Sequence, residues 1–122
     1  MNYTIYGEFP TLNEVIKVSK VHYGAYAQQK KKFTKIAKEH IAESDEIKGL
    51  CDWVFVWHRK DRRNDPDNIQ VGTKYILDAF VEEGIIENDG WKNINSIAHF
   101  YKVDKQNPRV EIYVNKVVGL NE

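Results

Sequence analysis

Hydrophobic and polar residues follow two different periods along the chain. Short stretches that alternate between the two kinds, or that are rich in β-branched and aromatic residues, predict strands at 3–9, 51–58, 96–103 and 109–117. Longer stretches with apolar residues three and four apart predict helices at 25–43 and 68–84. The order β-α-β-α-β-β predicts an α/β (α+β) domain, with a single mixed sheet of about four strands packed with two main helices.

The strand predicted at 51–58 differs from the others, because its sequence CDWVFVWH is apolar almost throughout. That composition predicts a strand buried on both faces near the centre of the sheet, with Trp53 and Trp57 in the core. The sequence DKQNP at 104–108 predicts a hairpin connection between the last two strands. Residues 10–24 show no regular period, and we expect an irregular connection there.

Composition places the chain among ordinary globular proteins. Its 122 residues, of which 42% are hydrophobic and 30% charged, suit a single domain over residues 1–122. The lone cysteine, Cys51, excludes an internal disulfide framework and a cysteine-based zinc site. Residues 1–10 lack the pattern of a signal peptide, and no run approaches the ~18 apolar residues of a membrane span. We therefore expect a soluble cytoplasmic protein.

Charge is balanced in total but not in distribution. The formal net charge is zero, with 18 basic and 18 acidic side chains, which argues against a protein that coats nucleic acid by bulk charge. Acidic residues nevertheless gather at 82–89, and basic residues gather at 58–63 and 30–32. The neutral total therefore hides separate basic and acidic patches.

The predicted helix at 68–84 separates into two faces. Asp67 is the candidate N-cap and Gly84 the candidate stop. Steps of about 100° per residue predict an apolar core stripe of Ile69, Thr73, Ile76 and Phe80. The opposite stripe then contains Asp67, Val71, Lys74 and Asp78, with Lys74 and Asp78 spaced as an i,i+4 ion pair.

Two carboxylates stand at the start of this helix. Asp65 precedes Pro66, which favours an extended backbone, so Asp65 and Asp67 can point toward the same place. One interpretation is a capped helix with a solvated Lys74–Asp78 pair. The other is a Mg²⁺ site open to phosphate, since close carboxylates need a shared cation and a helix N-terminus attracts phosphate. The third ligand would come from a later segment, for which the candidates are Asp89, Glu82, Glu83 and Glu87.

Several motifs together resemble the RusA family of Holliday-junction resolvases, which are small endonucleases associated with phages and prophages. The matching residues are DPDN at 65–68, Lys74, LDAF at 77–80, ND at 88–89 and PTLNEVI at 10–16. The pattern differs from other members in three places. The stretch from Asp67 to Lys74 is about three residues longer, so that Val71 stands where simple counting places the lysine. Asn64 and Asn88 stand where many members have arginine and aspartate.

The resemblance implies a catalytic set and a substrate. Asp65, Asp67 and Asp89 would bind Mg²⁺, with Mn²⁺ able to substitute, and Lys74 would be an essential active-site lysine. Asp78 would support Lys74 from outside the metal site. The residues expected to contact the DNA backbone are Arg59, Lys60, Arg62, Arg63, Asn68, Lys30, Lys31 and Lys32, although a solvated helix face explains the lysine run equally well. The implied activity is Mg²⁺-dependent, structure-selective cleavage that resolves four-way DNA junctions during recombination and repair in a bacterial or phage-infected cell. The implied assembly is a homodimer, because two strands are cut symmetrically.

Two alternatives share these residues. A flap-specific or general metal-dependent nuclease would use the same carboxylates and lysine. A non-catalytic DNA-binding phage module would use the carboxylates only to cap and pair. The second alternative predicts no Mg²⁺ binding.

Overall fold

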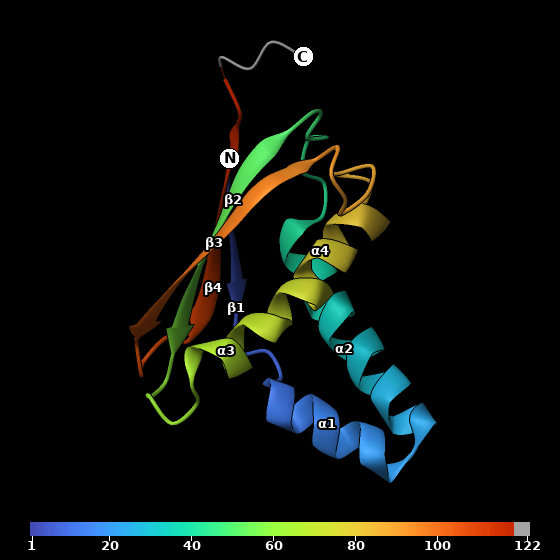
Figure 1. Cartoon of the computed structure of the whole chain (residues 1–122), viewed down its shortest axis with the longest axis vertical. Coiled ribbons are helices and arrows are strands. Elements are labelled where there is room, and N and C mark those ends of the chain that lie inside the picture. Colours follow the sequence, from blue (N-terminus) through green and yellow to red (C-terminus); the bar gives the residue numbers. More distant parts are fainter. Residues whose placement is uncertain (119–122) are drawn as a thin grey trace.

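The structure, a computed structural model, describes residues 1–118. Its centre is a four-stranded sheet in the order β1-β4-β2-β3 (Figure 1), with strands β1 (Asn2–Tyr6), β2 (Cys51–Arg59), β3 (Ile94–Val103) and β4 (Arg109–Lys116). Strand β3 runs parallel to β2, and the other neighbours are antiparallel. This mixed sheet confirms the predicted fold class.

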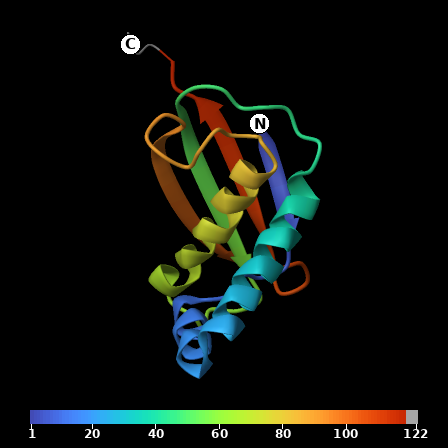
Figure 2. The same cartoon turned by 90° about the vertical axis from the view of Figure 1, so that its right-hand side faces the viewer.

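Helices cover only one face of the sheet. They are α1 (Leu12–Val21), α2 (Tyr23–Ile41), the short α3 (Pro66–Ile69) and α4 (Thr73–Glu82). Figure 2 looks onto the covered face, where α2 and α4 cross the strands. The core lies between these helices and the sheet and includes Trp53, Phe55, Trp57 and Phe80, each at most 1% exposed. In the part of the chain described here, no helix is long and apolar enough to cross a bilayer.

Strand β2 lies between β4 and β3, which confirms the predicted central position. Burial on both faces was the wrong expectation. Residues facing the helices, such as Trp53 and Phe55, are fully buried, whereas Val54 and Val56 on the opposite side are only half-buried. The physical reason is visible in Figure 1: all helices of residues 1–118 lie on the other side of the sheet. The side chains of this apolar run therefore alternate between a face that the helices bury and a face that the helices leave exposed.

The predicted hairpin between the last two strands is also wrong. Strands β3 and β4 do not pair with each other, because β2 lies between them and bonds to both. The turn around Asp104 instead crosses the end of β2, where the Asp104 N–H donates to the carbonyl of Arg59 at 2.8 Å. Turn residues show where the chain reverses direction but not which strand the following strand pairs with.

The irregular connection expected at 10–24 is mostly helical. Helix α1 begins with a capping box in which the Thr11 hydroxyl accepts from the N–H of Glu14 and the Glu14 carboxylate accepts from the N–H of Thr11. His22, in extended conformation, separates α1 from α2 and accepts the N–H of Ala25 through Nδ1 at 3.2 Å. Helix α1 buries no residue completely, although Val15 packs against the edge of the core.

The single helix predicted at 68–84 is broken into three pieces. A 3₁₀ turn, η1 (Gln70–Gly72), separates α3 from α4. Gly72 packs so closely on the sheet that a Cβ atom there would lie 3.1 Å from the Trp57 ring. The predicted stop is confirmed, because Gly84 follows the end of α4 with a positive φ of 70°.

Candidate active site

Lys74 in the first turn of α4 joins two carboxylates from different segments. Its Nζ lies 2.9 Å from Oδ1 of Asp78, one helical turn further on, and 3.0 Å from Oδ2 of Asp89 in the loop after the helix. These contacts, the hydrogen bond to Asp78 foremost, raise the pKa of Lys74 above its ordinary value. Lys74 is therefore a positively charged ammonium, and the predicted Lys74–Asp78 pair is confirmed.

The same cluster includes one residue of the lysine run. The Nζ of Lys30 on α2 lies 3.7 Å from Asp78, so Asp78 forms ion pairs with Lys30 of α2 and with Lys74 of its own helix. Lys31 and Lys32 are exposed, and the ammonium of Lys32 lies 5.4 Å from the centre of the Phe33 ring. The run is thus divided between a structural contact and a solvent-facing surface.

Asp65 and Asp67 stand at the start of α3, and neither caps it. Asp65 occupies the N-cap position in extended conformation, but its side chain accepts no capping hydrogen bond. Asp67, the predicted N-cap, lies inside the first turn after Pro66, so that expectation is wrong. Within residues 1–118 neither carboxylate has a hydrogen-bond or ion-pair partner, and both residues are exposed. The capping interpretation therefore loses its main support.

The expected stripe from Asp67 to Lys74 is interrupted by η1. A 3₁₀ turn advances about 120° and 2.0 Å per residue instead of about 100° and 1.5 Å, which rotates Lys74 away from Asp67. Lys74 accordingly pairs with Asp78 and Asp89 and not with Asp67. The helix that begins at Pro66 has only four residues, so it provides little dipole for the phosphate expected there.

The acidic residues at and after the end of α4 have different ion-pair partners. Glu82 and Glu83 lie 3.5 and 4.0 Å from the Nζ of Lys38, on the α2 side of the molecule. Asp89 alone among the candidate third ligands contacts Lys74. In the described residues, no three acidic, histidine or cysteine side chains lie together closely enough to hold a metal ion. The oxygen donors fit Mg²⁺ in kind, with two available at Asp65 and Asp67, while Asp89 is ion-paired with Lys74.

The basic loop after β2 contains one structural arginine. Arg59, expected to contact DNA, is 8% exposed; its guanidinium donates to the carbonyl of Phe9 and to Asn64 Oδ1, and it lies 3.5 Å from Glu8. Because Arg59 is buried and makes these contacts, we infer that it stabilises the loop. The exposed residues that follow are Lys60, Arg62 and Arg63, and Asn68 is half-buried.

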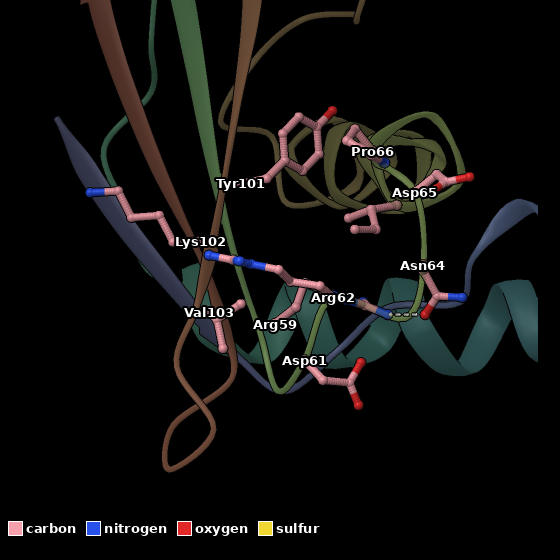
Figure 3. Close-up of a pocket in the computed structure, with 10 residues that line it drawn as sticks. Arg59, Asp61, Arg62, Asn64, Asp65, Pro66, Tyr101, Lys102 and Val103 are labelled. Atoms are coloured by element: carbon pink, nitrogen blue, oxygen red, sulfur yellow. Dashed lines mark hydrogen bonds between the residues drawn. The ribbon is translucent and has the colours of Figure 1, made fainter.

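Sequence reasoning missed an aromatic row beside Asp67. Tyr101 Oη donates to Gln70 Oε1 at 2.8 Å, and the Tyr101 ring stacks on His99. Burial raises the pKa of Tyr101, and the nearby negative charge of Asp67 raises it further. His99 Nδ1 accepts a hydrogen bond from Trp57 Nε1 at 2.9 Å, so its proton is on Nε2 when the ring is neutral. Figure 3 shows Tyr101 reaching from β3 toward α3, on the side where Asp65 and Pro66 lie.

The comparison with protein families agrees with this arrangement. Residues 9–115, nearly the whole chain, match the model of the family described as Endodeoxyribonuclease RusA. The match includes every residue of the candidate site, from Lys30 to Tyr101. No curated protein sequence matches the chain. The chain therefore belongs to the RusA family of endodeoxyribonucleases.

Proposed function

We propose that the protein is a Mg²⁺-dependent, structure-selective endonuclease that resolves four-way DNA junctions by paired phosphodiester hydrolysis, in recombination and repair. The observation that carries this proposal is the placement of Lys74. An ammonium held by Asp78 and Asp89 at the start of α4 follows, after the 3₁₀ turn η1, two carboxylates of α3 that no group among residues 1–118 neutralises, in a chain of an endodeoxyribonuclease family. We further propose that one RusA-like domain over residues 1–122 works in the cytoplasm of a bacterial or phage-infected cell.

Asp65, Asp67 and Asp89 are the proposed metal ligands. Bound Mg²⁺, or Mn²⁺ in its place, would activate water and relieve negative charge on the scissile phosphate. Asp65 and Asp67 have carboxylates exposed to solvent, whereas Asp89 has to exchange its contact with Lys74 before it can act as a ligand. Ligand exchange at Asp89 would couple metal binding to release of the lysine ammonium.

Lys74 is the proposed stabiliser of charge on the phosphate or on the leaving oxygen. Its raised pKa keeps it protonated near neutral pH, and its side chain is 62% exposed, so a phosphate can approach it. Positive charge fixed beforehand at the place where negative charge develops lowers the barrier to hydrolysis. Asp78 positions Lys74 from one turn away and is itself held by Lys30.

Backbone contacts outside the catalytic set would come from exposed basic side chains. We assign this role to Arg63 in the loop before Asp65, with Lys60, Lys31, Lys32 and Asn68 as further contacts. Arg62 in the same loop is a further proposed DNA contact. Such contacts are independent of sequence and weaken as salt rises. Arg59 acts indirectly, by holding the loop through Glu8 and Asn64.

A homodimer would supply two identical sites for two strands of like polarity. The open face of the sheet is the proposed contact, because it presents apolar side chains that no helix covers. Phe100 on β3 is 55% exposed there, beside the half-buried Val54 and Val56 of β2. Sedimentation of the wild-type protein should give the mass of a dimer, and Phe100→Glu should give a folded monomer. A monomeric wild-type protein would contradict this part of the proposal.

The test of function compares DNA substrates with and without Mg²⁺. Purified protein is incubated with a synthetic four-way junction, a flap, a duplex and a single strand of matched sequence. Junction cleavage only with Mg²⁺ supports the proposal. Equal cleavage of flap or duplex indicates a general nuclease, and binding without cleavage or Mg²⁺ affinity indicates a non-catalytic DNA-binding module.

A further inference from the structure

A pocket of about 250 Å³ lies directly beside Asp65. One side is formed by the start of α3, with Pro66 and Ile69, and the other by the end of β3, with Tyr101 and Val103 (Figure 3). Pockets for drug-sized ligands have volumes of roughly 300–1,000 Å³, so this one suits a smaller flat group. The pocket is therefore a second feature of the same site, because Asp65, one of the proposed metal ligands, lines it.

The aromatic wall of the pocket is fixed in place. The hydroxyl of Tyr101 donates to Gln70, and its ring stacks on His99 with the centroids 6.4 Å apart. His99 is in turn held by the indole N–H of Trp57, which is buried in the core. A side chain fixed by these contacts loses little conformational freedom when a ligand binds.

Polar groups complete the pocket. Figure 3 shows the side chain of Arg62 extending from the loop across the pocket toward β3. Arg62 is exposed, and no hydrogen bond or ion pair to it occurs among residues 1–118. A guanidinium can donate two parallel hydrogen bonds to a pair of neighbouring acceptors, such as those on the edge of a nucleobase.

We propose that this pocket binds one nucleobase of the strand to be cut, next to the scissile phosphate, and so sets which junction sequences are cleaved. Tyr101 provides the surface on which the base stacks, and Arg62 reads its acceptor edge. The inference rests on the proposed function, because it takes Asp65 and Asp67 to mark the position of the scissile phosphate.

A base, and not the backbone alone, is favoured by the apolar walls. Arg59, Arg62 and Lys102 in the lining attract a phosphate, but the carboxylates of Asp61 and Asp65 in the same lining repel it. Ile69, Val103, Pro66 and the Tyr101 ring offer a surface for a flat aromatic group. A paired base cannot enter a recess of this size and has to leave its stack first. Unstacking costs least where pairing is already weakened, as at the branch point of a junction.

The first experiment measures binding without cleavage. Wild-type protein without divalent metal is added to four-way junctions that carry the fluorescent base 2-aminopurine at one nucleotide near the branch point. Its emission rises when the base leaves its stack, so a rise is expected at one position per strand. Tyr101→Phe keeps the ring and should retain the rise, whereas Tyr101→Ala should lose most of it. Tyr23→Ala is the matched control, because that tyrosine is 85% exposed on α2 and does not line the pocket.

The second experiment measures cleavage with Mg²⁺ on junctions that differ only at that nucleotide. Wild-type protein should prefer one base, and an abasic site there should lower cleavage roughly tenfold, as expected for a lost base–aromatic stack. Tyr101→Ala should lower the rate similarly and flatten the preference, and Arg62→Ala should mainly flatten the preference. Thermal unfolding of each variant checks that the fold is intact.

The outcomes separate the two proposals. Junction cleavage with no fluorescence rise at any position, and an unchanged preference in Tyr101→Ala, overturns the pocket's role and leaves the nuclease proposal standing. No cleavage of any junction by wild-type protein overturns the nuclease proposal. In that case a fluorescence rise that Tyr101→Ala abolishes still supports base binding, and its absence overturns it.

Discussion

The ammonium of Lys74 lies 2.9 Å from Asp78 and 3.0 Å from Asp89, so one side chain ties helix α4 to the loop that follows it. This relationship gives the loop a defined position beside the helix without any metal. It also means that the lysine and the third proposed ligand are coupled, since a change at one alters the electrostatics of the other.

The first prediction concerns Asp78→Asn. The hydrogen bond from Lys74 to Asp78 is the largest cause of the raised lysine pKa, so its loss should lower the pKa of Lys74 toward the ordinary value near 10.4. Nuclear magnetic resonance of the lysine Cε–Hε groups measures this directly. Junction cleavage should fall roughly tenfold while junction affinity stays within a factor of about two, if a charge-assisted hydrogen bond of about 1.5–3 kcal/mol orients the lysine.

Glu82→Gln is the control for this change, because Glu82 lies on the same helix but pairs with Lys38. It should leave both the pKa of Lys74 and the cleavage rate unchanged. An equal loss of cleavage in both variants would show that a general change in charge, and not the contact with Lys74, matters.

The second prediction contrasts two arginines of one loop. Arg59→Met should lower the free energy of unfolding by several kcal/mol, since it removes a buried guanidinium and leaves the Phe9 carbonyl and Asn64 Oδ1 without their hydrogen-bond donor. Arg62→Ala should leave the free energy of unfolding within about 0.5 kcal/mol, because the side chain is exposed. Urea denaturation of both variants tests the difference.

Arg62→Ala should instead change which bases are preferred, whereas Arg63→Ala, which removes a proposed phosphate contact, should reduce the slope of log K against log salt by about one. A salt titration of junction affinity measures that slope. If Arg62→Ala unfolds more easily than Arg59→Met, the assignment of structural and DNA-contacting roles is reversed.

The third prediction concerns pH. Burial lowers the pKa of His99 below its ordinary value of 6.5. Above pH 6.5 the ring is neutral in both folded and unfolded chains and contributes nothing to the pH dependence. Below it, the unfolded chain takes up a proton that folded His99 resists, so the free energy of unfolding falls as pH decreases. Protonation would also set an N–H of His99 against the indole N–H of Trp57.

His99→Gln removes this titration and isolates its effect. The loss of stability between pH 7.5 and 5.5, measured by urea denaturation, should be smaller in the variant than in the wild type. Identical losses in both proteins would show that other groups account for the pH dependence.

The fourth prediction tests helix α1. Thr11→Ala removes the capping box with Glu14 and should cost about 1 kcal/mol of stability, within a range of about 0.5–2. Asn13→Ala, at an exposed position of the same turn, is the control and should have little effect. Thermal unfolding of the two variants shows whether the cap stabilises the folded protein.

Local patterns in the sequence predicted the strands and the ion pair of α4, because alternation and i,i+4 spacing act within a few residues. Helix α1 was missed although Thr11 and Glu14 form its capping box and Leu12, Val15 and Ile16 recur at helical spacing, because ten residues contain few repeats of that spacing. The hairpin was wrong because pairing depends on where β2 lies, which the turn residues do not encode.

The candidate site, like the fold, could be predicted from the sequence only in part. Lys74 and Asp78 are four residues apart and could be paired from spacing, whereas Asp89 depended on a family resemblance. Tyr101 and Gln70 are 31 residues apart and meet only through the packing of β3 against η1, so neither could be placed beforehand. The break at η1 was hidden because its cause, the closeness of Gly72 to Trp57, is a tertiary contact.

The central claim is that Asp65 and Asp67 hold the metal at the scissile phosphate. The most direct test compares wild-type protein and Asp67→Asn for cleavage of a synthetic four-way junction with Mg²⁺, and for junction binding without it. Because the Asp67 carboxylate has no protein partner in the described chain, the variant should fold and bind normally. The account predicts loss of cleavage by at least about a thousandfold with affinity nearly unchanged, since a metal ligand contributes several kcal/mol to the transition state. Full cleavage by Asp67→Asn would contradict it.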